Sequence, residues 1–129
     1  MKILLTLLML GSMLFASKAD FLHDYKQAIE IAKKENKDIY MLITSTSCQW
    51  CRKFEAKTLS NPDIIKLLKK DFVLLALTRD VDYIPSQYKA KRVPKHYFLT
   101  SKGEVIYAFL GYWSSEDFTS FIEDVKKKK

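Results

Sequence analysis

The sequence is poor in the residues that break regular structure or cross-link a small scaffold. Its 129 residues include three glycines and three prolines, which excludes collagen-like and low-complexity chains. Two cysteines are too few for a disulfide framework. Hydrophobic residues make up 48% and aromatic residues 13%, so the chain is not a disordered segment either. These absences leave a single globular domain of ordinary size.

The N-terminus has the three-part pattern of a secretory signal peptide. A short basic start, Met1-Lys2, precedes an apolar run over residues 3–16, and Ser17-Lys18-Ala19 places small residues around a cleavage point. The run is shorter than the roughly 20 residues of a membrane-spanning helix, which leaves an uncleaved anchor as the weaker alternative. We therefore expect a signal peptide over residues 1–19, a mature domain over residues 20–129 and a periplasmic location.

The net charge of +7 is concentrated at the ends of the chain. Lys126, Lys127, Lys128 and Lys129 form a basic tail, and the body without them is nearly neutral. Because nucleic-acid binding needs basic residues gathered on one folded face, we expect no nucleic-acid partner. A basic tail is usually solvated. Peripheral contact of residues 126–129 with an anionic membrane is the alternative.

Helix and strand signals alternate along residues 20–129. Apolar runs predict strands, and helical spacing or capping residues predict helices. In order, we expect a helix over 21–35, a strand over 39–43, a helix over 48–57, a helix from Asn61, a strand over 72–77, a helix over 82–91, a hairpin of strands over 97–100 and 105–110, and a helix from Ser114. This order predicts an α/β fold with a central mixed sheet of about four strands flanked by helices, preceded by an N-terminal helix.

The only two cysteines stand three residues apart in Cys48-Gln49-Trp50-Cys51, between a predicted strand and a predicted helix. A cysteine at a helix start is stabilised as the reactive thiolate, and a second cysteine one turn later can resolve a mixed disulfide. A zinc site and a purely structural disulfide are the alternatives. Zinc needs about four ligands, and His23 and His96, the other candidates, lie far apart in sequence. A loop of about four residues gains only ~2 kcal/mol from closure. The pattern favours redox chemistry.

Residues 37–125 resemble the thioredoxin superfamily. The closest similarity is to exported thioredoxin-like domains with a C-x-W-C motif and to the thioredoxin domain of bacterial transmembrane thiol:disulfide reductases. The residues that carry the resemblance are the strand 39–43, Cys48-Gln49-Trp50-Cys51, Val93-Pro94, Gly103 and Gly111. The resemblance implies a thioredoxin fold without a cofactor, in which Cys48 attacks, Cys51 resolves, and the two form a reversible disulfide. It also implies that Val93 and a cis Pro94 contact the substrate.

The sequence departs from that family at several positions. Leu42 stands where thioredoxins often carry a buried acid that assists the resolving thiol, and Glu55 either substitutes for it through water or is a solvated surface residue. Ser47 replaces a common tryptophan and is expected to cap the following helix. No histidine lies between the cysteines. Trp50 is a candidate substrate contact, with a plain surface aromatic as the alternative.

Four further residues are candidates for the site or its surroundings, and three of them have two interpretations. His96 shares a strand face with Pro94, so it either tunes binding near the active surface or is an ordinary exposed or half-buried histidine, which we favour. His23 is expected on the surface. Tyr112 and Trp113 follow Gly111 and form either a substrate rim or a packing contact.

These observations predict an exported thiol–disulfide oxidoreductase. We expect it to reduce or exchange disulfides of cysteine-containing exported proteins through Cys48 and Cys51, and to be reset by a redox partner such as a membrane thiol reductase. Three alternatives remain: a disulfide-forming oxidant or isomerase, a redox-inert thioredoxin-like module that binds exported clients, and a metal carrier that uses both thiols.

Overall fold

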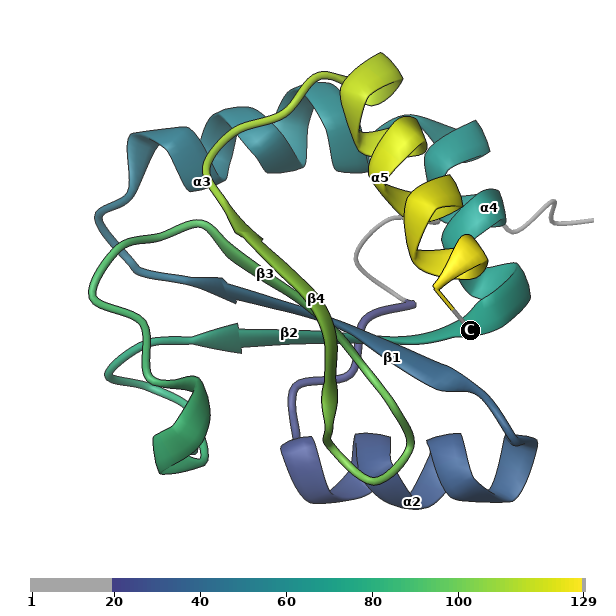
Figure 1. Cartoon of the computed structure of the whole chain (residues 1–129). Helices are drawn as coiled ribbons and strands as arrows, with labels where there is room; N and C mark the ends of the chain where they lie inside the picture. Colours follow the sequence, from purple (N-terminus) through teal and green to yellow (C-terminus); the bar gives the residue numbers. More distant parts are fainter. Residues whose placement is uncertain (1–19, 129) are drawn as a thin grey trace, which may run out of the picture.

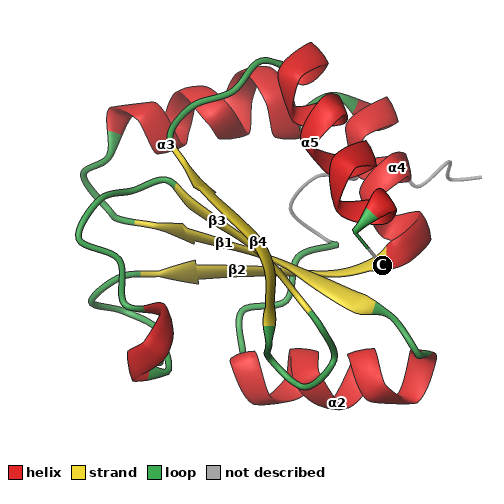
Figure 2. Ribbon diagram, viewed as in Figure 1, coloured by secondary structure: helices red, strands yellow, loops and turns green. Residues whose placement is uncertain are grey.

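The structure is a computed structural model that describes residues 20–128 (Figures 1 and 2). Its mixed sheet has the order β2-β1-β3-β4, with β1 parallel to β2 and the other pairs antiparallel. The strands are β1 Asp38–Thr44, β2 Phe72–Thr78, β3 Lys95–Leu99 and β4 Val105–Leu110. This arrangement confirms the predicted fold class. The expected signal peptide, residues 1–19, lies outside the described residues.

The central strand β1 is buried on both faces, which explains its continuous apolar run at residues 39–43. Successive side chains of β1 point to opposite faces. Tyr40 and Leu42 join one half of the core, whereas Ile39, Met41 and Ile43 join the other. The sheet therefore separates two hydrophobic layers, and both must be covered by helices.

Helices cover both faces of the sheet, as Figure 1 shows. Helix α2, Tyr25–Glu35, packs on one face through the small side chains of Ala28 and Ala32. The other face carries α3 Gln49–Phe54, the π-helical turn Glu55–Leu59, α4 Pro62–Asp71 and α5 Ser115–Lys127. Asn61 caps α4 and Ser114 caps α5, each by accepting a backbone N–H within the first turn, and both predicted helix starts are confirmed.

Two predicted helices have different bounds in the structure. The first helix starts at Tyr25, not at residue 21, because Asp24 caps it and Leu22 forms a short parallel bridge with Leu75 of β2. The helix expected over 48–57 continues as a π-helical turn to Leu59.

The helix expected over 82–91 is wrong, since this segment contains only a 3-10 turn at Ser86–Tyr88. Tertiary contacts replace the helical hydrogen bonds there. The Arg79 guanidinium binds the carbonyls of Ala90 and Lys91, and the Tyr88 hydroxyl donates to the carbonyl of Gly103.

The basic C-terminal residues lie partly against the domain. Lys126 forms an ion pair with Asp71 at 2.9 Å, and the ammonium of Lys128 lies 4.4 Å from the centre of the Tyr107 ring. Helix α5 continues to Lys127, so these lysines also stand at the favourable end of its dipole. Lys129 lies outside the described residues.

Candidate active site

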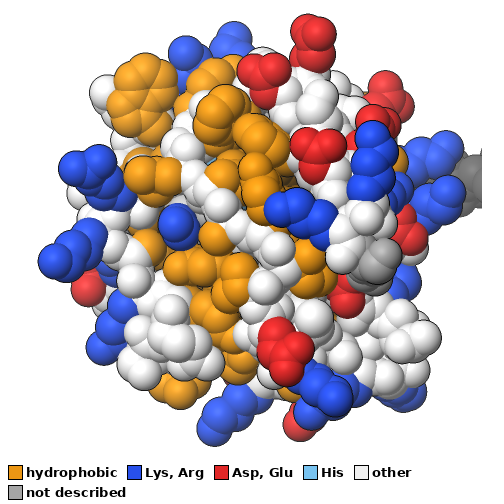
Figure 3. Space-filling model, in the orientation of Figure 1, with side chains coloured by type: hydrophobic (Ala, Val, Ile, Leu, Met, Phe, Trp, Pro, Cys, Tyr) orange, Lys and Arg blue, Asp and Glu red, His pale blue; other side chains and the backbone are white. Residues whose placement is uncertain are grey.

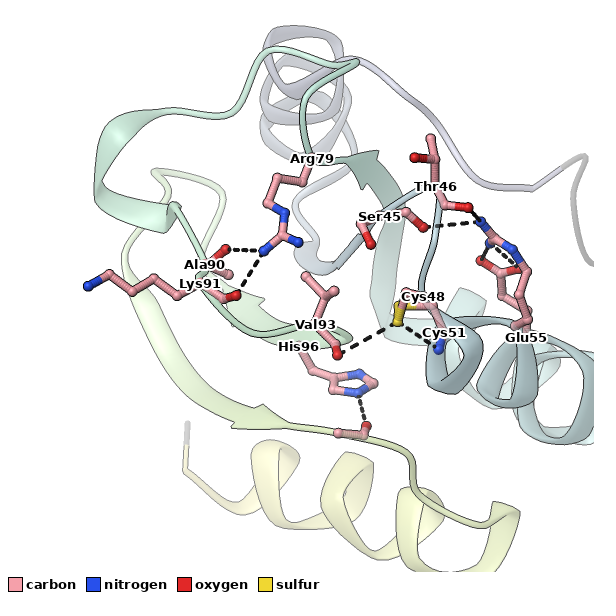
Figure 4. The surroundings of a disulfide bond; sticks show 12 residues. Ser45, Thr46, Cys48, Cys51, Glu55, Arg79, Ala90, Lys91, Val93 and His96 are labelled. Atoms are coloured by element: carbon pink, nitrogen blue, oxygen red, sulfur yellow. Dashed lines mark hydrogen bonds and ion pairs between the residues drawn. A yellow bond between two sulfur atoms is a disulfide. The ribbon is translucent and has the colours of Figure 1, made fainter.

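The two cysteines form a disulfide at the start of α3 (Figure 4). Their Cα atoms lie 5.2 Å apart, and the N–H of Cys51 donates to Sγ of Cys48 at 3.0 Å. Cys48 itself is the N-cap, so the prediction that Ser47 caps this helix is wrong. Sulfur takes the place of the usual side-chain oxygen at the cap. Cys48 is half-buried and Cys51 is fully buried, so only the first sulfur is within reach of another protein.

The loop before β3 faces the disulfide. The carbonyl oxygen of Val93 lies 3.7 Å from Sγ of Cys48, and the Val93–Pro94 peptide bond is cis (Figure 4). Pro94 is buried, and its carbonyl accepts the N–H of Gly111 at 2.8 Å. Gly111 has a φ of +103°, a conformation that suits glycine. The structure thus brings Cys48 against the Val93–Pro94 peptide, although the two lie 45 residues apart in the sequence.

His96 is fully buried beneath this loop, so the favoured exposed or half-buried placement is wrong. Its Nε2 lies 2.8 Å from the carbonyl oxygen of Gly111, and its Nδ1 lies 2.7 Å from the hydroxyl of Tyr40. Because a carbonyl only accepts, Nε2 must donate, and Nδ1 then accepts from Tyr40. The ring stacks on Phe109 at 4.3 Å. Burial lowers the pKa of His96 to about 4, so the ring is neutral at physiological pH.

A cavity of about 320 Å³ lies beside Leu42, the position where thioredoxins often carry an acid. Leu42 is buried, and Thr44, Arg52 and Glu55 also line the cavity. Glu55 is half-buried and pairs with Arg52 at 3.2 Å, so it is not a freely solvated carboxylate. The same guanidinium donates to the carbonyls of Ser45 and Thr46 in the loop before Cys48 (Figure 4). The positive charge of Arg52 is therefore engaged away from the sulfur.

An aromatic pair borders the disulfide on the helix side. Trp50 is 50% exposed, and its ring centre lies 6.4 Å from that of Tyr112. The ammonium of Lys53 lies 5.1 Å from the Trp50 ring and 4.6 Å from the Tyr112 ring, within cation–π range. Trp113 instead packs edge-on against Phe121 at 4.8 Å. Both Tyr112 and Trp113 also pack against the hydrophobic core, so each forms a packing contact, and the substrate rim stays a prediction.

Sequence analysis missed one residue of this region. Arg79, which fixes the backbone of the loop before β3 at Ala90 and Lys91, had no local signal, because its partners lie eleven and twelve residues away.

The two histidines lie in separate places. His23 is exposed at the outer edge of β2, where its Nδ1 contacts the carbonyl of Ala76, and both ring nitrogens of His96 are engaged in the core. Among residues 20–128 no three His, Cys, Asp or Glu side chains are grouped closely enough to hold a metal ion. In the same part of the chain, no helix is long and apolar enough to cross a membrane.

The geometry defines the class of protein. A C-x-x-C disulfide at a helix start, facing a cis-proline loop at the end of a β2-β1-β3-β4 sheet, is the arrangement of a thioredoxin-fold protein with a redox-capable cysteine pair. Residues 25–126 match the thioredoxin-like domain family, and the chain belongs to it. The predicted relationship to the thioredoxin superfamily is confirmed.

Solved structures share this fold at low sequence identity. A thioredoxin from Thermus thermophilus is similar with a TM-score of 0.69 and 20% identity, over 80% of this chain and 84% of that chain. A DsbH oxidoreductase is similar with a TM-score of 0.69 and 16% identity, over 87% and 90%. The C-terminal domain of DsbD from Neisseria meningitidis has a TM-score of 0.64 and 19% identity, over 84% and 99%.

The curated relatives match only in part. Human spermatogenesis-associated protein 20 is 34% identical over 55 residues, which are 43% of this chain and 7% of that protein. The mouse protein of the same name is 33% identical over the same length. The chain thus spans a small part of the length of these relatives. Fold and cysteine pair together support thiol–disulfide oxidoreductase activity in general.

Proposed function

We propose that this chain is an exported protein-disulfide reductase that works in the periplasm on cysteine-containing proteins. The observation that carries the proposal is that the two cysteines differ in solvent exposure. Cys48 is half-buried and lies beside the Val93 carbonyl, whereas Cys51 is fully buried behind it. One sulfur is placed to meet a substrate and the other to complete the exchange.

The reaction has two exchange steps. The Cys48 thiolate attacks a substrate disulfide, which forms a mixed disulfide and releases one substrate thiolate. The Cys51 thiolate then attacks Sγ of Cys48, which closes the Cys48–Cys51 disulfide and releases the second substrate thiolate. The substrate gains two electrons and this protein loses them, so an external dithiol, such as that of a membrane thiol reductase, must reduce the pair again.

The local environment favours the reducing direction. A strongly oxidising pair owes its potential to a stabilised thiolate. Within residues 20–128, Sγ of Cys48 accepts one backbone N–H, that of Cys51, and the guanidinium of Arg52 is engaged with Glu55. No histidine lies between the cysteines. The DsbH structure, named an oxidoreductase, and the DsbD domain support the reaction class.

Two cysteine variants test the activity and the roles of the sulfurs. We expect Cys48→Ser and Cys51→Ser each to abolish catalytic reduction of insulin disulfides. Cys51→Ser should also accumulate a mixed disulfide with insulin through Cys48, because the resolving thiol is gone. Ser47→Ala, which changes the exposed neighbouring residue, is the matched control and should retain activity. Full activity of Cys48→Ser would support the binding module instead.

The reduction potential tests the direction. Equilibration across glutathione ratios, followed by thiol alkylation and mass spectrometry, should give a value near −250 mV or lower. A value near about −130 mV would make the protein an oxidant or isomerase. The proposed export has its own test, since expression of the full chain in a bacterium should give a periplasmic protein that begins at Asp20.

A further inference from the structure

The residues around the disulfide carry much of the positive charge of the molecule. Residues 48–57 and 89–95 contain seven Lys and Arg side chains and one acidic side chain, Glu55. The remainder of residues 20–128 contains twelve Lys and Arg against fourteen Asp and Glu. In Figure 3, Lys and Arg lie along the left edge, where Figure 1 places the start of α3 and the loop before β3, and also at the right and lower edges, whereas Asp and Glu gather mainly over α5. The excess of basic over acidic side chains is therefore concentrated at the redox end of the fold.

The first group of basic residues, Lys91 and Arg92, lies in the loop before β3. Lys91 and Arg92 are exposed and directly precede Val93, whose carbonyl lies 3.7 Å from Sγ of Cys48. The Arg79 guanidinium holds the carbonyls of Ala90 and Lys91 at 3.1 and 2.8 Å, so the backbone that carries these charges is fixed (Figure 4). In the same view, the side chain of Lys91 extends away from the protein.

The second group lies on α3. The ammonium of Lys53 stands over the rings of Trp50 and Tyr112 and is exposed. Among the ion pairs of residues 20–128, none includes Lys53, Lys91 or Arg92. Cations with no carboxylate within ion-pair distance thus lie both on the loop that carries Val93 and on the helix that Cys48 caps.

The acidic groups nearby offset this charge only in part. Glu55 pairs with Arg52, and Asp80 lies 3.9 Å from Arg79. Asp82 shares a cavity with Lys91, and its carboxylate accepts the N–H of Thr78 at 2.7 Å, a neutral donor that does not neutralise it, so Asp82 offsets part of the charge of Lys91. Arg92 and Lys53 remain as the cations least affected by acidic neighbours.

We propose that the substrates and redox partner of this chain carry acidic side chains next to their reactive cysteines. This proposal rests on the proposed function and adds a chemical preference to it. The basic surface surrounds a disulfide, and a protein brings the cysteines that react with it whereas a nucleic acid does not. Complementary charge accelerates association, and salt screens the effect, so both the preference and its salt dependence are measurable.

Three peptides with one internal disulfide test the preference. They share a sequence except for two positions beside the reactive cysteines, which are Glu, Gln or Lys. At low salt, about 20 mM, we expect kcat/KM for the Glu peptide to exceed that for the Lys peptide by roughly tenfold. At about 500 mM salt, where the Debye length is roughly 4 Å, the ratio should fall to within about twofold. Equal rates for all three peptides at low salt would overturn the proposal.

A pair of double variants locates the effect. Lys91→Glu with Arg92→Glu should remove or invert the preference for the Glu peptide. Lys66→Glu with Lys102→Glu makes the same change in net charge at two exposed lysines away from the disulfide and should preserve the preference. Loss of preference in both double variants would overturn the local assignment. A single-stranded oligonucleotide that binds more tightly than the Glu peptide would also overturn it, in favour of a nucleic-acid surface. If neither peptides nor insulin are reduced, the proposed function fails as well.

Discussion

Lowering the pH from 7 to 4 should destabilise the fold through His96. The pKa of this ring is about 4 in the folded protein because the ring is buried, against 6.5 for an ordinary histidine. Below pH 6.5 the unfolded chain therefore binds a proton that the folded chain does not. The free energy of unfolding falls with decreasing pH, by at most about 1.4 kcal/mol per pH unit, until the folded protein also protonates near pH 4. The difference in pKa corresponds to about 3 kcal/mol in total.

The variant His96→Phe isolates this contribution. At pH 7 it leaves the hydroxyl of Tyr40 and the carbonyl of Gly111 without their partner, which costs about 2–4 kcal/mol. At pH 4 the wild type has lost the advantage of a neutral histidine, so the two proteins should be nearly equal in stability. His96→Gln, which retains an amide donor, should show the same loss of pH dependence with a smaller cost at pH 7.

Urea unfolding at several pH values between 4 and 7.5 measures the effect. His23→Gln is the matched control, because His23 is the only other histidine and is exposed. Its stability should follow the wild type across the whole range. A constant difference in stability between His96→Phe and the wild type from pH 7.5 to 4 would refute the reasoning, since the pH dependence would then come from the carboxylates alone.

Three further substitutions have defined outcomes. Gly111→Ala should cost about 1 kcal/mol in urea unfolding, because the φ of +103° disfavours any side chain while no atom lies within 4 Å of the added methyl group. Asn61→Ala should lower the stability by about 1 kcal/mol through loss of the α4 cap, and Asn61→Asp should restore most of it. Tyr88→Phe should cost about 1–3 kcal/mol in thermal or urea unfolding, since the half-buried carbonyl of Gly103 loses its donor; an unchanged stability would contradict that role.

Local patterns predicted the regular elements well. The apolar runs at 39–43 and 72–77 lie within β1 and β2, which pair in parallel. Asn61 and Ser114 form the caps that their side chains predicted. These features are set by residues close together in the sequence, so they can be predicted from one sequence alone.

Features that depend on distant partners were predicted poorly. His96 was expected to be exposed or half-buried, but Tyr40 and Gly111 supply a buried donor and acceptor that lie 56 and 15 residues away. The segment 82–91 has helical spacing, yet contacts with Arg79 and Gly103 hold it in another conformation. In the candidate site, too, the locally encoded feature was predictable and the long-range contact was not. The C-x-x-C spacing indicated the disulfide locally, whereas the position of Val93 against Cys48 depended on the resemblance to a family.

The short bridge at Leu22 has a consequence for self-association. Its N–H and carbonyl bond to Leu74 and Ala76, which occupies the outer backbone groups in the middle of β2. Among the described strands, β4 forms the other edge of the sheet and pairs only with β3. A sheet that can add strands at one edge can join a second copy edge to edge, but it cannot extend into a fibre, because the pair would have no free edge left. Association through backbone hydrogen bonds would therefore end at a closed two-fold dimer.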